Sequence, residues 1–467
     1  MRNTLFYFFV LCVCFLNGQT NDTIVLNFNE YLGFVKKYHP IAKQAELTIA
    51  VGQANLMKSR GGFDPKIEVD FETKEFKNTE YYDRLNATFK IPTWYGVTLK
   101  GTFEQSDGTF LNSDEAGLEN GLYAAGVSMS LGQGLWINER MATLKQAKFF
   151  REQTKADRDL LINEILFDAS LAYFDWLQAY NESQIFNNFL KNATIRFEGV
   201  KRSAASGQVA AIDTVEAKIA VQDRQLSFEQ AKVMLMKTSL ELSNFLWLND
   251  NIPLEIQENV IPDQKLNREI DITLETLGVP LDSFTIENHP KLKSLDFKIQ
   301  SLNVEKNLKA NKLLPKIDLE YNFLTETPEL INSLQTPNYK GGITVELPLF
   351  LRKERGDLKL AKFKLRDAEL DFQNAEIAIK NKIVAIYREL DSFEIQNQLI
   401  DDIVQNYRTL LMAEERKFSF GESSLFLINS RESKLIDSEL KKNQVQNKFF
   451  TAKAKLFNSL ATNPTNL

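Results

Sequence analysis

The chain has 467 residues, of which 43% are hydrophobic and 25% are charged. This composition supports a large core and excludes a low-complexity or disordered chain. Lysine and arginine total 56 against 62 aspartates and glutamates, and this net charge of -6 gives no reason to expect nucleic acid as a partner. With only two histidines and two cysteines, metal sites, Cys/His nucleophile pairs and a disulfide scaffold are poorly supplied. We therefore expect no metal and no cofactor.

The first 19 residues have the layout of a secretory signal peptide. Arg2 precedes an apolar run at 5–16 and a small, polar exit at 17–19. The run is too short to span a bilayer as a helix, although an N-terminal anchor helix is the alternative. Both cysteines lie inside the run, so cleavage after it leaves a mature chain without cysteine. No later stretch of 18 apolar residues occurs, so we expect any membrane contact to be made by a β-barrel.

Two long tracts lack the strongest helix breaker. Prolines are absent from 93–252 and from 349–463, and both tracts are rich in Ala, Leu, Glu, Lys and Gln. We expect one helix from 138 to about 206 and another from 357 to about 420, each roughly 100 Å long at 1.5 Å per residue. The second tract carries apolar residues every seven positions, which predicts a coiled-coil seam. That seam consists of Leu358, Leu365, Phe372, Ile379, Ile386, Phe393, Ile400 and Tyr407.

Each expected long helix ends at a glycine. Gly207 follows the first expected helix and Gly421 follows the second, and a further helical stretch comes after each, at 210–248 and 424–460. Because glycine readily adopts the backbone of a tight turn, each pair is expected to form an antiparallel helical hairpin.

Six segments change from a period of seven to a period of two. Apolar and polar residues alternate in four segments between about 65 and 131 and in two between about 315 and 347. Charges on the second face suit a wet lumen, and strands of about ten residues suit a bilayer. A half-buried sheet of a soluble protein is the alternative. The residues expected to face lipid are Ile67, Val69, Phe71, Leu85, Phe89, Ile317, Leu319 and Tyr321.

The chain is internally duplicated. His39-Pro40 and His289-Pro290 are each followed 26 residues later by Pro-Lys-Ile, so the two copies are offset by 250 residues. Because the residue before proline favours a helix boundary, we interpret both histidines as markers of a repeated helix start rather than as ligands. The expected division is a signal peptide at 1–19, repeat 1 at 20–248, a proline-rich linker or equatorial segment at 249–283, and repeat 2 at 284–467.

Taken together, these features resemble the TolC-like outer-membrane efflux protein (OEP) family. The residues that carry the resemblance are the paired Pro-Lys-Ile strand starts, the strand exit at 347–350 and the tip segments at 204–217 and 418–430. The resemblance implies an α+β membrane protein, a homotrimer with one shared β-barrel in the outer membrane and a periplasmic tunnel of long helical hairpins. It also implies an exit duct for an efflux pump or a type I secretion system. The implied partners are a periplasmic adaptor (membrane fusion) protein, an inner-membrane transporter and outer-membrane lipid.

The tips are the expected site of adaptor docking and gating. By resemblance this site comprises Gly207, Asp213, Glu216, Gly421, Leu427 and Ser430. Family tunnels are commonly narrowed by aspartates after the second tip glycine, where this chain has Leu427 and Ser430. In the first repeat the acid is present as Asp213, and we hypothesise that Asp213 helps to hold the closed tip; the alternative is a helix-capping or solvated residue.

The first strand region, 65–131, is about twice as long as the second, 315–347. It contains four alternating segments, whereas the family usually has two strands per repeat. We expect all four of its strands to join the barrel, which gives six strands per protomer and eighteen in a trimer; an extracellular flap on a twelve-stranded barrel is the alternative. Trp94 and Tyr95 would then lie in an aromatic interface girdle. No HExxH, GxSxG or CxxC motif occurs, so we expect no enzyme. A periplasmic coiled-coil structural or adaptor protein and a single-chain porin are the competing functions.

Overall fold

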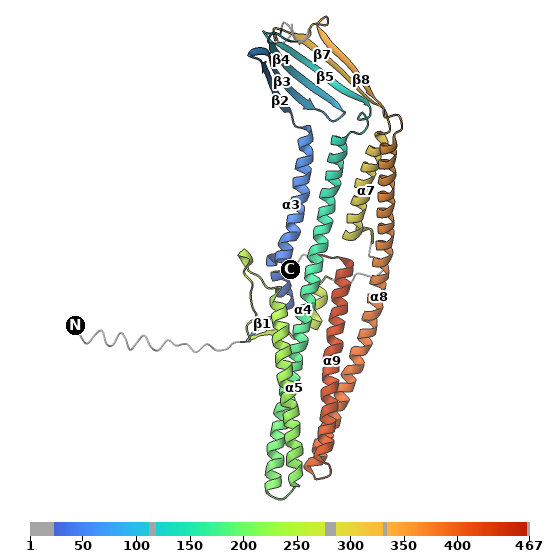
Figure 1. Ribbon diagram of the computed structural model, residues 1–467. Helices are drawn as coiled ribbons and strands as arrows, with labels where there is room; N and C mark the ends of the chain where they lie inside the picture. Colours follow the sequence, from blue (N-terminus) through green and yellow to red (C-terminus); the bar gives the residue numbers. More distant parts are fainter. Residues whose placement is uncertain (1–22, 112–117, 276–285, 330–333, 465–467) are drawn as a thin grey trace, which may run out of the picture. The chain divides into compact units, whose positions relative to one another are not determined.

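A computed structural model describes residues 23–111, 118–275, 286–329 and 334–464 (Figure 1). The expected signal peptide at 1–19 and part of the expected linker, 276–283, lie outside the described residues. The chain forms two compact units. Unit 1 comprises Met1–Gln44, Leu161–Phe284 and Ile379–Leu467, and unit 2 comprises Ala45–Leu160 and Thr285–Ala378.

Two very long helices run through both units and confirm the expectation from the proline-free tracts. Helix α4 (Glu139–Ala205) has 67 residues and helix α8 (Arg352–Ser419) has 68 residues. They are followed by α5 (Ala211–Ser243) and α9 (Leu425–Leu460), so each repeat contains a helical hairpin. The shorter helices and the two short strands are α2 (Phe28–Tyr38), α3 (Pro40–Arg60), α6 (Leu266–Thr273), α7 (Pro290–Asn311), β1 (Ile24–Leu26) and β6 (Val260–Pro262), with 3-10 turns η1 (Gly61–Phe63), η2 (Asn249–Asn251) and η3 (Ile286–Asn288).

All eight positions of the expected coiled-coil seam of α8 are buried or half-buried. Leu365, Ile386, Phe393 and Ile400 are all less than 9% exposed. In unit 1, Val404, which lies one turn after Ile400, packs in one cluster with Phe189 and with residues of α9. Burial of this apolar stripe, rather than helix propensity alone, is what stabilises helices of this length.

Unit 1 has an aromatic core where α4 meets the N-terminal segment. The buried ring of Tyr173 lies against Phe28 and Tyr31, with ring centroids 5.2 and 5.5 Å apart. Its hydroxyl donates to the carbonyl of Leu26 at 2.7 Å and accepts the N–H of Asp263 at 3.1 Å. Because β1 and β6 also pair in parallel, this one tyrosine ties both short strands to α4.

Both histidines cap a helix, as the duplication predicted. Nδ1 of His39 accepts the N–H of Ile41 at 3.2 Å at the start of α3, and Nδ1 of His289 accepts the N–H of Lys291 at 3.1 Å at the start of α7. A proline follows each histidine at the first helical position, where its missing N–H is not needed. The repeated His-Pro is therefore a helix-start motif.

All six alternating segments form one sheet in unit 2. Its strands are β2 (Lys66–Phe76), β3 (Thr79–Pro92), β4 (Val97–Asp107), β5 (Leu122–Gly132), β7 (Lys316–Thr325) and β8 (Tyr339–Glu346). They are antiparallel in the order β2-β3-β4-β5-β7-β8, as Figure 1 shows. The middle hairpin, β3 and β4, lies inside the sheet and does not fold away from it as a flap. Strands β2 and β8 are its two edges.

Candidate functional site: the sheet faces and the hairpin tips

The strand register gathers the apolar residues of all six strands on one face. Ile67 is opposite Phe89, and Phe71 is opposite Leu85. Across the join between the repeats, Met129 is opposite Leu319, and Leu319 is opposite Ile343. Directly opposed residues of a sheet share a face, so the eight residues expected to face lipid lie on the same side.

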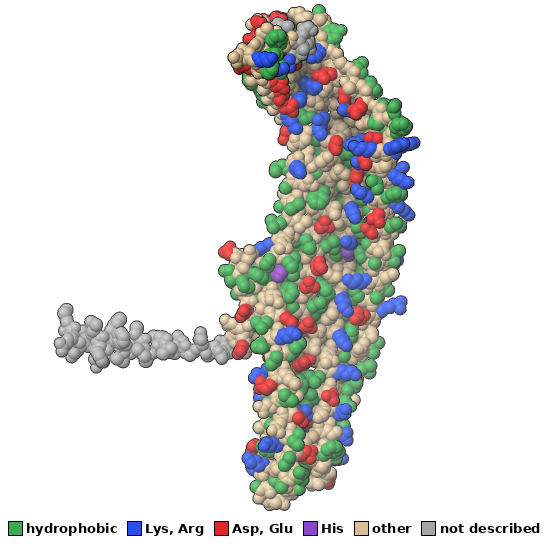
Figure 2. Space-filling view, in the orientation of Figure 1, with side chains coloured by type: hydrophobic (Ala, Val, Ile, Leu, Met, Phe, Trp, Pro, Cys, Tyr) green, Lys and Arg blue, Asp and Glu red, His purple; other side chains and the backbone are tan. Residues whose placement is uncertain are grey.

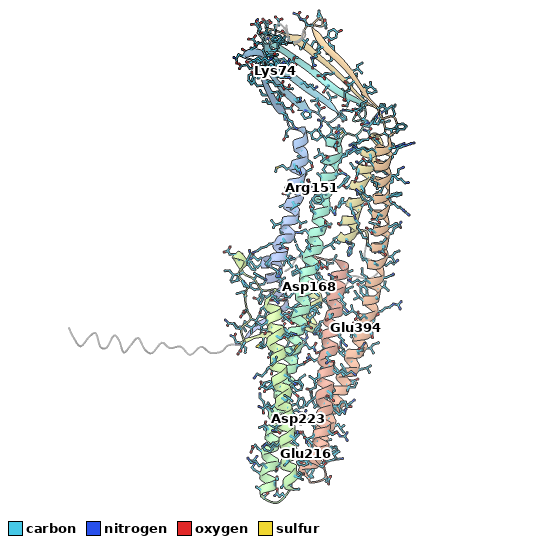
Figure 3. The ribbon with its side chains drawn as sticks, in the orientation of Figure 1. Lys74, Arg151, Asp168, Glu216, Asp223 and Glu394 are labelled. Carbon is cyan, nitrogen blue, oxygen red and sulfur yellow. The ribbon has the colours of Figure 1, made fainter. Side chains whose placement is uncertain are left out.

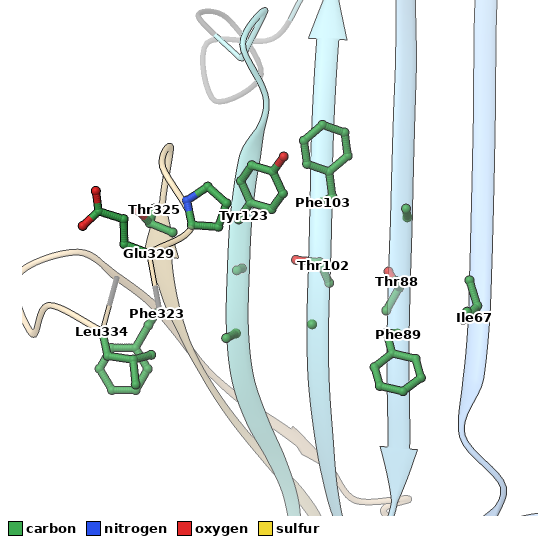
Figure 4. Close-up of a pocket in the computed structure, with 15 residues that line it drawn as sticks. Ile67, Thr88, Phe89, Thr102, Phe103, Tyr123, Phe323, Thr325, Glu329 and Leu334 are labelled. Carbon is green, nitrogen blue, oxygen red and sulfur yellow. The ribbon is translucent and has the colours of Figure 1, made fainter. Parts of the chain in front are cut away.

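This apolar face is exposed in the single chain. Ile67 is 75% exposed, Val69 is 59% exposed, and Ile343 of the last strand is 72% exposed. Figure 4 shows part of the face, where Phe89, Phe103 and Tyr123 project from neighbouring strands around a hollow of about 650 Å³. A continuous apolar surface of this kind marks an interaction site for a protein or a membrane.

The opposite face of the sheet is polar and carries charges of both signs. Lys90 pairs with Glu68 across β2 and β3. The ammonium of Lys100 lies 3.1 Å from a carboxylate oxygen of Glu320, which joins a strand of repeat 1 to one of repeat 2. Ser130 Oγ donates to Asp318 at 2.5 Å on the same side. One apolar and one charged face on the same strands is the pattern of a sheet between lipid and water.

The two residues expected at the interface girdle have different surroundings. Trp94 stacks on Phe63 with ring centroids 5.5 Å apart and an interplanar angle of 21°. It packs against a buried cluster that includes Leu56 of α3 and Leu144 of α4, whereas Tyr95 is 68% exposed. Trp94 thus fixes the β3–β4 turn to the helices of unit 2, and the ring of Tyr95 is exposed.

Both hairpin tips have the same backbone geometry. Gly207 has φ +74° and Gly421 has φ +78°, both in the left-handed region that favours glycine. At the first tip, the N–H of Gly207 donates to the carbonyl of Ala204 and the N–H of Gln208 donates to Ser203, at 3.0 and 2.9 Å. The second tip repeats this pair of bonds from Gly421 and Glu422. Each long helix therefore ends in a Schellman motif, which satisfies its last carbonyls and reverses the chain.

The other expected tip residues lie in the first turns of the returning helices. Asp213 is half-buried in the first turn of α5, where its charge complements the helix dipole. Glu216, labelled in Figure 3, accepts a hydrogen bond from the amide of Asn429 of α9 at 3.1 Å. Leu427 is 37% exposed, and Ser430 is exposed. Glu216 is thus the one of these four side chains that links the two hairpins.

A buried ionic cluster joins all four long helices near the tips in unit 1. Glu432 of α9 is 2% exposed and lies 2.6 Å from Arg196 of α4 and 3.5 Å from Arg224 of α5. Arg196 also pairs with Glu415 of α8 at 3.1 Å. Arg224 donates to Ser433 at 2.9 Å. These contacts link the two hairpins near their tips, next to the apolar cluster of Phe189, Val404 and Ile428.

Sequence reasoning missed this cluster, although one signal for it was present. The buried seam of α9 runs with spacings of three and four through Leu425, Ile428 and Leu435. Glu432 occupies a position of that seam, and a carboxylate on an apolar stripe predicts a buried cation nearby. The partners Arg196 and Arg224 lie on other helices, so the sequence alone does not identify them.

Neither a membrane-spanning helix nor a metal-binding cluster occurs among the described residues. Among residues 23–111, 118–275, 286–329 and 334–464, no helix is both long and apolar enough to cross a membrane. Within the same stretches, no group of three or more His, Cys, Asp or Glu side chains could hold a metal ion.

Residues 283–462 match the family model of the outer membrane efflux proteins. No protein of curated function matches the chain significantly. The match covers repeat 2 almost entirely, and it confirms the resemblance that the duplicated strands and tips indicated.

The whole chain has the fold of solved outer-membrane channels. It is 13% identical to the CmeC outer membrane channel of Campylobacter jejuni, covering 93% of this chain and 85% of that one with a TM-score of 0.64. It is 12% identical to the MtrE outer membrane channel of Neisseria gonorrhoeae, solved in an open state, with coverages of 95% and 93% and a TM-score of 0.65. The outer membrane protein VceC of Vibrio cholerae is 11% identical, with coverages of 93% and 96% and a TM-score of 0.64. At these identities the likeness confirms the fold.

Proposed function

We propose that this chain is a TolC-like outer membrane efflux protein, three copies of which form the exit duct of an efflux pump or a type I secretion system. The single observation that carries this proposal is the sheet, because its register separates a continuous apolar face from a charged one over six strands. That separation fits strands with lipid on one side and an aqueous lumen on the other. Cargo would move from the periplasmic end of the duct to the exterior.

The edges of the sheet support assembly with further copies. Strands β2 and β8 end the sheet, and each presents unpaired backbone groups on its outer side. Such groups are not tolerated in a bilayer, so β2 of one chain needs a partner such as β8 of the next. Because the six strands alternate in direction, β2 and β8 run antiparallel, and copies joined in this way keep an antiparallel barrel of eighteen strands.

Unpartnered helical stripes also support assembly. On α5, apolar residues recur every seven positions with exposures from 51% to 69%, although the other seam of the helix is buried. This stripe consists of Ile212, Ile219, Leu226, Val233 and Leu240. Further along α8 than its first turns, Leu370 and Ile377 are also seven positions apart and are 49% and 61% exposed. Heptad stripes of this kind pack against helices of other chains in coiled coils.

The tips are proposed to dock a periplasmic adaptor, through which an inner-membrane transporter delivers cargo. Phe420 is 69% exposed and Phe426 is 68% exposed at the second tip, and Ile212 is 69% exposed at the first. Exposed aromatic and apolar residues at a turn are suited to a helical partner. No GxxxxGK[ST] motif occurs in the chain, so the energy would come from the inner-membrane partner.

The first test is the location and mass of the assembled particle. Membranes are fractionated, the mature protein is extracted in detergent, and the particle is weighed by light scattering with the detergent subtracted. An outer-membrane particle of three chains is expected. A detergent-independent monomer or dimer would reject the duct and favour a periplasmic coiled-coil scaffold.

The second test is the burial of the middle hairpin in lipid. Single cysteines replace Leu85 and Phe89 on the apolar face, with Thr88 on the charged face as the matched control. The chain's own cysteines, at 12 and 14, lie in the expected signal peptide and give no background in the mature protein. A lipid-soluble thiol probe should label the first two positions and not the third. Labelling of Thr88→Cys alone, or of none of them, would argue against eighteen membrane-spanning strands.

A further inference from the structure

The start of α8 is strongly basic in a chain that is acidic overall. Between 352 and 366 there are seven lysines and arginines and two acids, whereas the whole chain has a net charge of -6. One of the two acids, Asp357, is already paired with Lys309 of α7 at 3.0 Å. Figure 2 shows these Lys and Arg side chains gathered over the first turns of α8, in the orientation of Figure 1.

Four of these cations form a stripe on one face of the helix. Arg352, Arg355, Lys359 and Lys362 are separated by three, four and three residues, the spacing of neighbours on a helix surface. All four are exposed, and among the described residues none of them has an acidic partner. We call these four residues the basic stripe. Like charges at this spacing repel each other, and cations in the first turn oppose the helix dipole, so the stripe is unfavourable without an anion.

The basic stripe continues directly from the apolar face of the sheet. Strand β8 exposes Ile343 and Val345, and the same alternation in sequence leads to Leu347 and then to Leu349, which is 89% exposed. Phe350 is 72% exposed, and the guanidinium of Arg352 lies 5.2 Å from the centre of its ring. The contact with Phe350 puts the beginning of the stripe beside an exposed aromatic ring, which is the composition of a membrane interface.

We propose that the basic stripe binds the anionic headgroups of phospholipids in the periplasmic leaflet of the outer membrane. The inference rests on the proposed function, in which the apolar face of the sheet lies in that membrane. Charge complementarity selects the lipid class, since phosphatidylglycerol and cardiolipin headgroups are anionic and phosphatidylcholine has no net charge. The adjoining apolar residues favour a lipid over a soluble phosphate, because they contact the acyl region next to the headgroup.

The dimensions agree with this assignment. From Arg352 to Lys362 the helix rises about 15 Å at 1.5 Å per residue. The headgroup layer adds roughly 5–8 Å on each side of the hydrocarbon core, and charges act over about 8 Å beyond it at physiological salt. Arg352 and Arg355 thus reach the headgroups directly, and Lys359 and Lys362 lie within the field of an anionic surface.

The test uses the full-length trimer in detergent and in vesicles. Bound lipid is counted by native mass spectrometry while phosphatidylglycerol or phosphatidylcholine is titrated at low and high salt. The fourfold variant R352Q/R355Q/K359Q/K362Q is compared with a control that removes two arginines and two lysines from the hairpin ends, K201Q/R202Q/K218Q/R416Q. We expect the wild type and the control to prefer phosphatidylglycerol, and the fourfold variant to bind it at least about tenfold more weakly.

The outcomes separate this inference from the proposed function. The lipid assignment is wrong if the fourfold variant keeps the wild-type preference for phosphatidylglycerol, or if the wild type has no such preference. Channel formation by both proteins in phosphatidylcholine vesicles would then still support the proposed function. If lipid binding is unchanged and the ion selectivity of the pore shifts toward cations, the stripe faces the lumen and the assignment is likewise wrong. If the wild type inserts into neither kind of vesicle, the proposed function fails.

Discussion

Removal of the carboxylate of Glu432 is the sharpest test of the structure near the tips. In Glu432→Gln the side chain keeps its size and one carbonyl oxygen, but two arginines lose the only buried charge that lies between them among the described residues. Removing one partner of a fully buried ion pair costs about 3–5 kcal/mol. Here Arg196 retains Glu415, and the side chains of Arg196 and Arg224 are 14% and 15% exposed. We therefore expect a loss of about 2 kcal/mol for local opening of the hairpin ends.

The assay is hydrogen exchange of the amides at 425–440 in the assembled protein. A loss of about 2 kcal/mol corresponds to roughly thirtyfold faster exchange. Asp401→Asn is the matched control, because Asp401 is 57% exposed and pairs with Lys442 at 2.7 Å on the surface. Such exposed pairs contribute about 0.2–1 kcal/mol, so its exchange should change by less than about fivefold. Equal effects of the two substitutions would refute the idea that Glu432 anchors the hairpins.

Three further predictions concern the tip glycine, the tip acid and a capping histidine. Gly207→Ala should destabilise the protein by about 1 kcal/mol and lower its thermal midpoint, because the left-handed backbone is strained for alanine although the added Cβ meets no atom within 4 Å. Gly199→Ala is the control: it lies inside α4, its added Cβ also meets no atom within 4 Å, and it should raise the midpoint. Asp213→Ala should increase the conductance of the reconstituted channel, and an unchanged conductance would reject a role in holding the closed tip. Burial lowers the pKa of His39 in the folded protein. The stability contributed by the neutral imidazole is therefore complete above pH about 6.5, and it is lost as the pH falls from there through the lower pKa of the folded protein. A thermal midpoint that falls between pH 7.5 and 5 less steeply in His39→Gln than in the wild type would confirm this, and equal slopes would contradict it.

The helices, strands and tips of this fold could be predicted from the sequence because each depends on a local pattern. Strands with one apolar face alternate regardless of their partners, so 65–131 and 315–347 could be recognised as strand regions without knowing the sheet order. Gly207 and Gly421 were identifiable because the left-handed position at the end of a helix is restricted mainly to glycine. The two His-Pro pairs could likewise be interpreted as helix starts, because that signal lies in two adjacent residues.

The contacts that the sequence did not reveal join residues that are distant along the chain. Trp94 was expected in an aromatic girdle, and its stacking on Phe63 depends on a turn and a helix end meeting in space. The pairing of Glu432 with Arg196 spans different hairpins, and many other charged residues could have been chosen as partners. The basic stripe of α8 was present in the sequence, but it acquires meaning only beside the exposed Phe350 and the end of β8.

The two repeats differ in their strands but not in their helical hairpins, and this inequality has a functional consequence. Repeat 1 contributes four strands and repeat 2 contributes two, while each contributes one long hairpin closed by the same glycine cap. In the proposed trimer the barrel would have eighteen strands and the tunnel twelve long helices. Because barrel diameter grows roughly linearly with strand number, this barrel would be about half again as wide as one of twelve strands. In such a trimer the β3–β4 hairpin would enlarge the membrane end alone, and the narrowest point would be set by the tips. Substitutions at Asp213 and Glu216, rather than on the charged face of the sheet, should then control the conductance.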